Sequence, residues 1–407
     1  CRRLSCTGIL DLAKAWENKF VNPIYLDNQA TTPVDPRVTK AMIPYLSEQF
    51  GNAASIHHSL GRKAKETVEH SRKILANEIN ARPKEIIFTS GATESINLAI
   101  RGVCEKNMDK GHIITQATEH KAVLDTCDAM EKKGWDITIL PVDDRGKVDP
   151  HSVKDAMRDD TVLVAIMHAN NEIGTIQPIA EFGKICRKNG VLFLVDACQS
   201  FGKLDIDVNL MHIDLLAATA HKIYGPKGIG LLYAKSKDPK VELVEQITGG
   251  GHEHRRRSGT LPVHQIVGFG RAVTICDPSE NEELSFLQNM LINGVMAVHS
   301  DAHLNGSTDH RLANNINFSF PGLDAETLII KMKGIACSTG SACSTANLEP
   351  SHVLKAIGLK NEMAHSSIRF SLGRFNTKEE IRRAINEINH VLSSVKENSP
   401  RQQLLHV

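Results

Sequence analysis

The chain has 407 residues, of which 41% are hydrophobic and 23% are charged, and its formal net charge is +1. This is the composition of a globular protein. The balanced charge gives no indication of a direct nucleic-acid or membrane partner, and no apolar run approaches the roughly 18 residues that cross a bilayer. Because the length exceeds that of one typical hydrophobic core, we expect two domains.

Nine cysteines are scattered along the chain without CxxC pairs. Neither a disulfide framework nor a zinc ribbon is therefore indicated, and a reducing compartment is favoured. Residue 1 is Cys, and the basic start at Arg2 and Arg3 resembles the remnant of an organellar presequence, whereas Asp11 and Glu17 oppose that interpretation. We expect a cytoplasmic protein, with the matrix of a mitochondrion or related organelle as the alternative.

Apolar runs alternate with helical patterns from about residue 55 to 235. Ala64, Val68, Leu75 and Ile79 recur at helical spacing. Strand-like runs follow at residues 85–89, 113–114, 137–140, 162–167, 191–195, 213–217 and 229–233. Apolar strands separated by helices predict an α/β fold, with a large and mainly parallel sheet covered on both faces. Ligands of such sheets bind beyond the carboxyl ends of the strands.

From about residue 280 the pattern changes to polar helices and shorter strands, which predicts a smaller α+β domain. Thr377 and Glu380 form a capping box that opens a helix with an apolar stripe. We expect a large domain over residues 24–279, a small domain over 280–399 with the segment 1–35 packing on it, and a short tail at 400–407.

Lys222 lies just after the apolar run that ends at Ala217, between His221 and a Gly/Pro-rich loop. Burying an ammonium group is costly unless its pKa falls, and Schiff-base chemistry requires a lysine with a depressed pKa. The structural alternative is a lysine that reaches solvent from the end of a strand.

The segment Thr89–Ser95 follows the first strand of the predicted sheet and opens a helix. Its small residues let backbone N–H groups converge on an anion, to which the helix dipole and the hydroxyls of Ser90 and Thr93 would add. An ordinary capped helix start is the alternative. The segment lacks the lysine and the glycine spacing of nucleotide-binding loops.

Three further polar residues follow predicted strands. Asp196 ends the run 191–195, where a carboxylate must be paired or hydrogen-bonded; it suits a cationic ring nitrogen, or alternatively caps a helix. His120 and Asn171 also follow strands, although a lone histidine is more often structural. Together with Lys222 and the anion-binding turn, these residues predict a pyridoxal phosphate site.

Cys343 lies in a run of small residues that predicts a mobile loop able to deliver a thiol to a substrate, because the run lacks the apolar periodicity of a core cysteine. Arg369 lies in a strand-like run and suits capture of a carboxylate, with a structural ion pair as the alternative. His252 and His254 have the H-x-H spacing of metal ligands, but no further ligand follows at zinc-like spacing, so we expect no metal site.

These segments resemble the group I cysteine desulfurases of the iron–sulfur cluster type, which are fold-type I pyridoxal phosphate enzymes of the class V aminotransferase superfamily. The resemblance runs from Ile24 to about Ser399. Its most specific segments are residues 30–33, 90–95, 170–172, 221–226, 257–260 and the run Ser-Thr-Gly-Ser-Ala-Cys that ends at Cys343. It implies a seven-stranded, mainly parallel sheet in the large domain.

The resemblance implies a role for each matching residue. Lys222 would be the Schiff-base lysine, Cys343 the nucleophile that accepts sulfur, and His120 the residue that stacks on the ring and deprotonates Cys343. The other implied cofactor contacts are Gly91, Ala92, Thr93, Asn171, Asp196, Gln199, Thr219 and His221, and Thr260 would reach the phosphate of a neighbouring subunit in a homodimer. Arg369 and Asn171 would hold the substrate carboxylate.

The implied activity is conversion of L-cysteine to L-alanine with transfer of sulfur to Cys343 as a persulfide, which then passes to an acceptor such as an iron–sulfur scaffold. A selenocysteine lyase shares the fold and cofactor and is the first alternative. A catalytically idle scaffold or regulatory homologue is the second, and the intact set of site residues argues against it. An aminotransferase would have no use for the thiol of Cys343.

The chain departs from the family pattern at several positions. Thr219 and Ala220 stand in place of the usual Ser-Gly before His221, and threonine keeps the hydroxyl. Arg255 and Arg256 replace the usual Gly and Met, which changes backbone freedom and charge near the expected subunit boundary. Housekeeping members carry a longer tail than residues 400–407, and that tail is implicated in docking the iron–sulfur scaffold.

Overall fold

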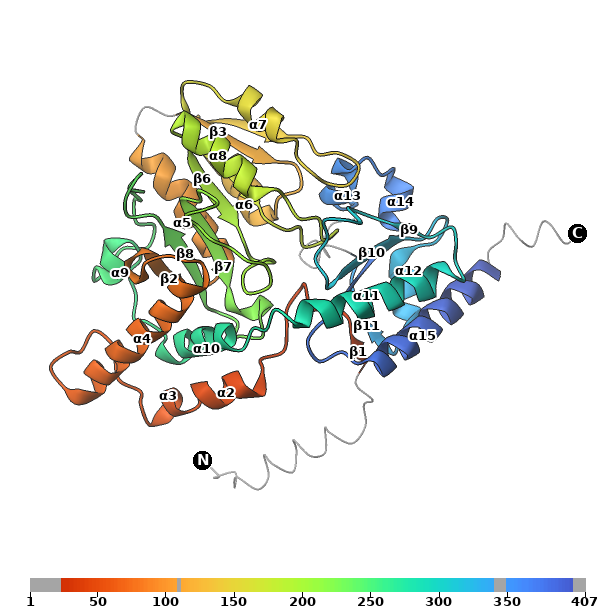
Figure 1. The fold of residues 1–407 in the computed structure, drawn as a ribbon, viewed down its shortest axis with the longest axis horizontal. Helices are drawn as coiled ribbons and strands as arrows, with labels where there is room; N and C mark the ends of the chain where they lie inside the picture. Colours follow the sequence, from red (N-terminus) through yellow and green to blue (C-terminus); the bar gives the residue numbers. More distant parts are fainter. Residues whose placement is uncertain (1–22, 108–110, 340–348, 398–407) are drawn as a thin grey trace, which may run out of the picture.

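The computed structural model describes residues 23–107, 111–339 and 349–397. Its largest element is a seven-stranded sheet with the strand order β2-β8-β7-β6-β5-β3-β4 (Figure 1). The strands are β2 (Ile86–Thr89), β3 (His112–Gln116), β4 (Asp136–Leu140), β5 (Thr161–Met167), β6 (Leu192–Asp196), β7 (Leu215–Thr219) and β8 (Gly230–Ala234). All seven lie within about two residues of the predicted runs, and the predicted α/β fold class is confirmed.

The directions of the strands place the loops that carry the predicted site residues at one edge of this sheet. β3, β5, β6 and β7 are parallel neighbours, and β8 is antiparallel to both β7 and β2. β2 therefore runs in the same direction as β7, so its carboxyl end also lies at the edge where the parallel strands end. The loops after β2, β3, β5, β6 and β7 consequently meet along one line, as expected for ligand binding by an open α/β sheet.

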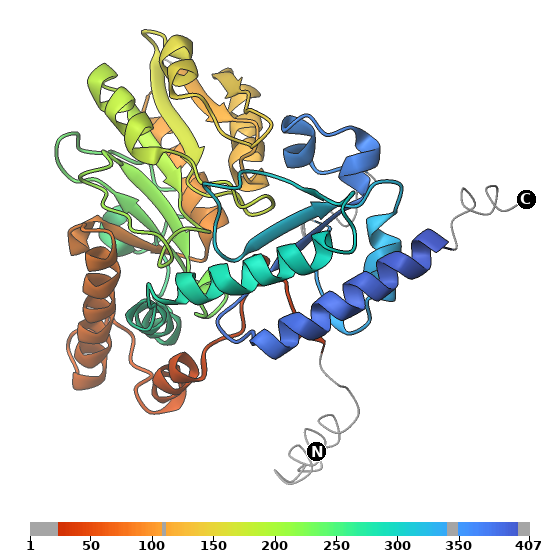
Figure 2. The ribbon, with the colours of Figure 1, turned by 45° about the vertical axis from the view of Figure 1, so that its right-hand side comes forward.

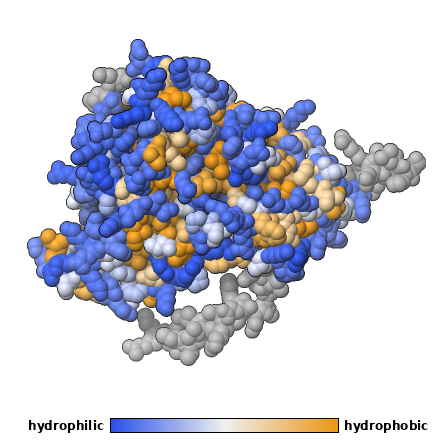
Figure 3. All heavy atoms as spheres, in the orientation of Figure 1, coloured by the Kyte–Doolittle hydropathy of each residue, from blue (hydrophilic) through white to orange (hydrophobic). Residues whose placement is uncertain are grey.

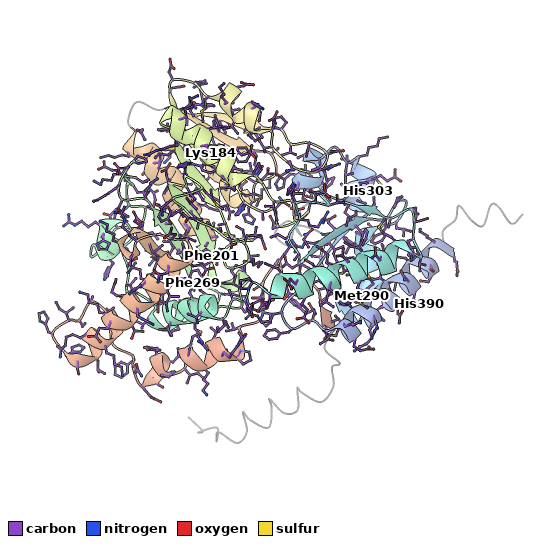
Figure 4. The ribbon with its side chains drawn as sticks, in the orientation of Figure 1. Lys184, Phe201, Phe269, Met290, His303 and His390 are labelled. Atoms are coloured by element: carbon purple, nitrogen blue, oxygen red, sulfur yellow. The ribbon has the colours of Figure 1, made fainter. Side chains whose placement is uncertain are left out.

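Both faces of the sheet are covered because side chains along each strand alternate between two cores. Ile86 and Phe88 enter the core on one face, and Ile87 enters the core on the other. The first core is completed by α4 (Ser59–Glu78), α8 (Ile179–Asn189) and α10 (Val263–Thr274), and the second by α5 (Ala92–Lys106) and α6 (Lys121–Glu131). Figure 4 labels Phe201 and Phe269, whose rings pack edge to face in the first core with their centroids 5.9 Å apart.

A smaller layer lies beside the sheet and has its own core. Its three-stranded sheet, in the order β12-β10-β9, contains β12 (Ser367–Ser371), β10 (Asn315–Ser319) and β9 (His303–Leu304). Long helices α11 (Glu280–Met296) and α15 (Lys378–Glu397) run side by side against it (Figure 2). The capping box of α15 is confirmed, because Thr377 and Glu380 exchange two hydrogen bonds at 3.0 and 3.2 Å.

The remaining elements are short. They are β1 (Ile24–Tyr25), α2 (Pro36–Met42), α3 (Pro44–Ser47), α7 (Pro150–Ala156), α9 (His252–Arg255), α12 (Ala325–Lys331), β11 (Ile335–Ala336), α13 (His352–Ala356), α14 (Asn361–His365) and the 3-10 helices η1 (Pro83–Glu85) and η2 (Ala220–Lys222). β1 pairs in parallel with β11, so the start of the described chain packs with the smaller layer. The expected boundary at residues 279 and 280 stays a prediction.

Apolar side chains are distributed over the visible surface among hydrophilic ones (Figure 3). In the described part of the chain, no helix combines the length and apolarity that crossing a membrane requires. Nor do three His, Cys, Asp or Glu side chains gather there as a potential metal-binding group.

The segment around α9 has an unusual backbone. Glu253, His254 and Arg255 have φ values of 49°, 58° and 62°, which lie in the left-handed region that costs L-residues about 1–2 kcal/mol each. Glu253 is held by a buried ion pair with Arg72 at 2.7 Å and by the N–H of Phe88 at 2.8 Å. These contacts anchor the segment against α4 and β2 and maintain its strained conformation.

We expect Arg255→Gly to raise the free energy of unfolding by about 0.5–1 kcal/mol, because glycine adopts positive φ without a steric penalty. Arg255 is exposed, so little packing is lost. Arg256 has an ordinary φ of −108°, and Arg256→Gly should lower stability through chain entropy. Urea denaturation of both variants checks this, and an equal loss of stability in the two would contradict it.

Candidate active site

A cavity of about 510 Å³ opens at the carboxyl edge of the large sheet. It collects most of the site residues predicted from the sequence. Those lining it are Gly91, Ala92, Thr93, His120, Asn171, Asp196, Gln199, Thr219, His221, Lys222 and Arg369. Thr260 is exposed and is not among the lining residues, and Cys343 lies outside the described residues. The catalytic and binding roles of all these residues stay predictions.

Lys222 ends a short 3-10 turn that begins directly after β7. Its Nζ donates hydrogen bonds to the carbonyl oxygens of Gln29 and Ala30, the latter at 2.7 Å. The side chain therefore points into the cavity toward the segment that follows β1. Next to it, burial lowers the pKa of His221 to about 4, with the charge of Lys222 contributing, so the imidazole is neutral at pH 7.

Asp196 ends β6 and is 4% exposed. One carboxylate oxygen accepts the N–H of Cys198 at 2.9 Å, and no Lys, Arg or His among the described residues lies within ion-pair distance. Nearby Glu119 is completely buried, and burial followed by the charge of Asp196 raises its pKa well above the usual range.

His120 caps the N-terminus of α6, and its Nδ1 accepts the N–H of Ala122 at 3.0 Å. The proton of the neutral ring therefore lies on Nε2. Burial lowers the pKa of His120; Asp196 opposes this shift, while Lys222 adds to it. At pH 7 His120 is a neutral ring with its Nε2–H available as a donor.

The turn after β2 leads into α5, whose first backbone N–H groups are not capped by a side chain. Such an uncapped helix start attracts anions. Glu94 closes one side of the turn, because its carboxylate accepts the Ser90 N–H at 2.7 Å and pairs with Arg257 at 2.8 Å. The ion pair ties the turn to the segment around α9.

Arg369 enters the cavity from β12 of the smaller layer, with 1% of its side chain exposed. Its Nη2 pairs with Asp27 at 2.7 Å, and its Nη1 donates to the carbonyl oxygen of Asn171 at 2.7 Å. These contacts fix the plane of the guanidinium. The cavity is thus built jointly by the large sheet and the smaller layer.

Several lining residues were not singled out from the sequence. His352, at the start of α13, lines the cavity and its Nε2 lies 2.9 Å from the carbonyl oxygen of Glu119. Cys198 lines it next to Asp196. No local pattern indicates His352, because a histidine opening a short helix is common; only the fold brings it beside His120.

The residues of this cavity fit pyridoxal phosphate. The buried carboxylate of Asp196 has no cationic partner in the described chain, which suits the ring nitrogen of the cofactor, and the buried Oε1 of Gln199 has no hydrogen-bond partner there. The uncapped start of α5 suits the phosphate, and Lys222 suits covalent attachment. Each part of the cofactor therefore has matching residues along one wall.

Comparison with known proteins agrees with this geometry. Residues 24–384 match the family model described as aminotransferase class-V. A cysteine desulfurase IscS from Psychromonas ingrahamii is 51% identical over 384 residues, which cover 93% of this chain and 95% of the relative. Among solved structures, a NifS-like protein matches with a TM-score of 0.85 at 37% identity, covering 91% of this chain and 99% of that chain.

The chain belongs to the class-V aminotransferase family. Within that family it is a pyridoxal-phosphate-dependent cysteine desulfurase. A further solved structure, described as SspA in complex with cysteine, matches with a TM-score of 0.78 at 38% identity, covering 87% of this chain and 100% of that chain. The resemblance, the enzyme class and the cofactor predicted from the sequence are confirmed.

His168 of this cysteine desulfurase lies directly behind the site, and its backbone N–H donates a hydrogen bond to the carbonyl oxygen of Asp196 at 2.9 Å. Burial lowers the pKa of its imidazole to about 4 from 6.5. As the pH falls, His168 binds a proton in the unfolded chain before it does so in the folded protein. The contribution of neutral His168 to stability is therefore fully present above about pH 6.5 and is lost as the pH falls toward 4.

We expect His168 to account for about 2 kcal/mol of the stability that the protein loses between pH 7 and pH 5. His168→Gln should remove that share, whereas His57→Gln, at an exposed position, should not. Urea denaturation at the two pH values measures the difference. An unchanged pH dependence in His168→Gln would contradict the prediction.

Proposed function

We propose that this enzyme converts L-cysteine to L-alanine and transfers the sulfur to Cys343 as a persulfide, for iron–sulfur cluster assembly and related sulfur trafficking. The observation that carries the proposal is the convergence of Lys222, Asp196, His120 and Arg369 on one cavity. Similarity to cysteine desulfurases and to a structure described as a complex with cysteine supports L-cysteine as the substrate.

Arg369 is suited to hold the substrate carboxylate. Asp27 and the Asn171 carbonyl hold its guanidinium in place, and the planar guanidinium geometry is suited to recognition of a carboxylate. Asn171 itself lines the cavity. The substrate would then lie with its Cα near Lys222.

Bound pyridoxal phosphate supplies an electron sink for the negative charge that develops on the substrate Cα. Asp196 would keep the positive charge on the cofactor ring nitrogen, and the N-terminus of α5 with Thr93, Thr219 and His221 would hold the phosphate. Lys222 would take the proton from Cα. His120 would stack on the ring and present its Nε2–H.

Sulfur transfer requires the thiolate of Cys343. The thiolate forms an S–S bond to the substrate sulfur while the substrate Cβ–S bond breaks and its electron pair stays on the substrate. Proton return then gives L-alanine, so cysteine and the Cys343 thiol yield alanine and a persulfide without an external oxidant. With Nδ1 engaged by Ala122, His120 can donate a hydrogen bond from Nε2 in this step; removing the proton from Cys343 would require the ring to switch tautomer.

A homodimer and a sulfur acceptor complete the proposed function. Thr260 is exposed and outside the cavity of its own chain, which is compatible with a role in the partner subunit's site. Exposed apolar side chains from the end of α2 to the first turn of α4 are suited to form an interface; they are Ile43, Leu46, Phe50, Ile56 and Leu60. An iron–sulfur scaffold is the proposed acceptor.

The proposal predicts that Cys343→Ser abolishes alanine formation from L-cysteine while leaving the visible absorbance of bound cofactor unchanged, because serine cannot accept sulfur. Alanine release and the mass of the Cys343 peptide, heavier by one sulfur atom in the wild type, provide the measurement. Cys104→Ala is the control, since burial raises the pKa of that thiol to about 12 and it cannot supply thiolate. Alanine release by Cys343→Ser at the wild-type rate would refute the role of Cys343.

For Arg369→Lys we expect KM for L-cysteine to rise roughly tenfold or more, because an ammonium group cannot hold Asp27, the Asn171 carbonyl and a carboxylate together. Steady-state kinetics alongside the thermal unfolding midpoint separate binding from folding. Arg382→Lys, at an exposed ion pair on α15, serves as the control. The role in binding fails if KM stays at the wild-type value.

A further inference from the structure

A second and larger cavity, of about 770 Å³, lies on the other side of two turns that build the active site. The turn after β6 lines the active-site cavity through Cys198 and Gln199 and the second cavity through Lys203. The segment after β7 lines the active-site cavity through Lys222 and the second cavity through Tyr224. The two cavities thus share a thin wall.

Lys203 lies in this wall and its environment is unusual for an ammonium group. Its Nζ is closed off from solvent and has no hydrogen-bond partner among the described residues. Its backbone carbonyl accepts the side-chain amide of Asn281 at 2.7 Å, which fixes the turn. The second cavity does contain carboxylates, but none of those described lies within ion-pair distance of Lys203, and Glu280 is bound to Arg374 at 2.7 Å.

An uncompensated buried ammonium opposes folding, and an apolar side chain of similar shape would be more stable at such a position. Burial first, and the charge of Lys222 second, lower the pKa of Lys203 to about 8, so it still carries its proton at pH 7. A charge kept at such a cost near the reacting groups points to a function.

We propose that Lys203 is a positioning residue whose buried positive charge, held behind the wall of the active site, favours the uncharged form of the Lys222 nitrogen. That form is the one that attacks a carbonyl and removes a proton. The proposal rests on the role proposed for Lys222 above.

The other groups that face Lys222 differ in whether they favour its charged form. Asp196 and the carbonyl oxygens of Gln29 and Ala30 favour a positive charge on Lys222. His120 and His221 are neutral at pH 7, because burial lowers the pKa of each.

Cys198 is neutral as well, since burial and then Asp196 raise the pKa of its thiol well above the usual range. Burial likewise raises the pKa of Cys276, next to Lys203, to about 11. Lys227 and Arg369 line the same cavity as Lys222; Lys227 is exposed to solvent, and Arg369 is matched by Asp27. The Nζ of Lys203, in contrast, is buried, and no described carboxylate lies within ion-pair distance of it.

The test compares Lys203→Met, which removes the charge and keeps the length, with Lys203→Arg, which keeps a charge at every accessible pH. The readout is a pH titration of the visible absorbance of pyridoxal phosphate bound to Lys222 without substrate, because that absorbance depends on the protonation of the Lys222 nitrogen. We expect the midpoint to rise by about one pH unit in Lys203→Met and to stay at or below the wild-type value in Lys203→Arg.

Thermal unfolding at pH 7 supplies the control for folding. Lys203→Met should melt at the wild-type temperature or higher, because the uncompensated charge is gone. An unchanged absorbance midpoint in Lys203→Met overturns the inference. If that variant also melts at a lower temperature than the wild type, Lys203 has a structural role instead. If Lys203→Met does not fold, Lys203→Gln takes its place as the neutral variant. A wild-type protein without the visible absorbance would instead overturn the proposed role of Lys222.

Discussion

The site depends on one geometric constraint, namely that strands running in the same direction end at the same edge of a sheet. β2, β3, β5, β6 and β7 all end there, and each is followed by a turn that contributes to the cavity. Alternation of apolar side chains into two cores fixes the register of every strand. A slip of one residue would turn Asp196, at the end of β6, toward a core where its carboxylate has no partner.

The second constraint is that the large sheet alone does not close the cavity. Arg369 comes from β12, and the carbonyl oxygens that bind Lys222 come from the segment after β1. Both belong to the part of the structure that packs with the smaller layer. The lysine and the arginine are therefore placed relative to each other by packing between two cores, which explains why polar contacts such as Asp27–Arg369 lie at that junction.

Much of the fold follows from the sequence because continuous apolar runs of strand length, separated by helical patterns, leave few alternatives to a covered parallel sheet. Lys222, Asp196, His120 and Asn171 were predicted as site residues because polar groups directly after such strands must share an edge. Lys203 and His352 were not, since their significance arises from neighbours distant in sequence. The backbone at Arg255 also follows from tertiary contacts, because the Arg72–Glu253 pair maintains a conformation that the local residues disfavour.

The Asp27–Arg369 ion pair joins residues that are 342 positions apart. During synthesis, Lys222 and the carboxyl edge of the large sheet would leave the ribosome well before β12 does. A nascent chain therefore contains Lys222 before it contains Arg369, the residue proposed to hold the substrate carboxylate, and contacts of such separation in sequence form late. With the role proposed for Arg369, selectivity for the substrate would be acquired only when the chain is nearly complete, so cofactor loading after release from the ribosome would be the safer order of assembly.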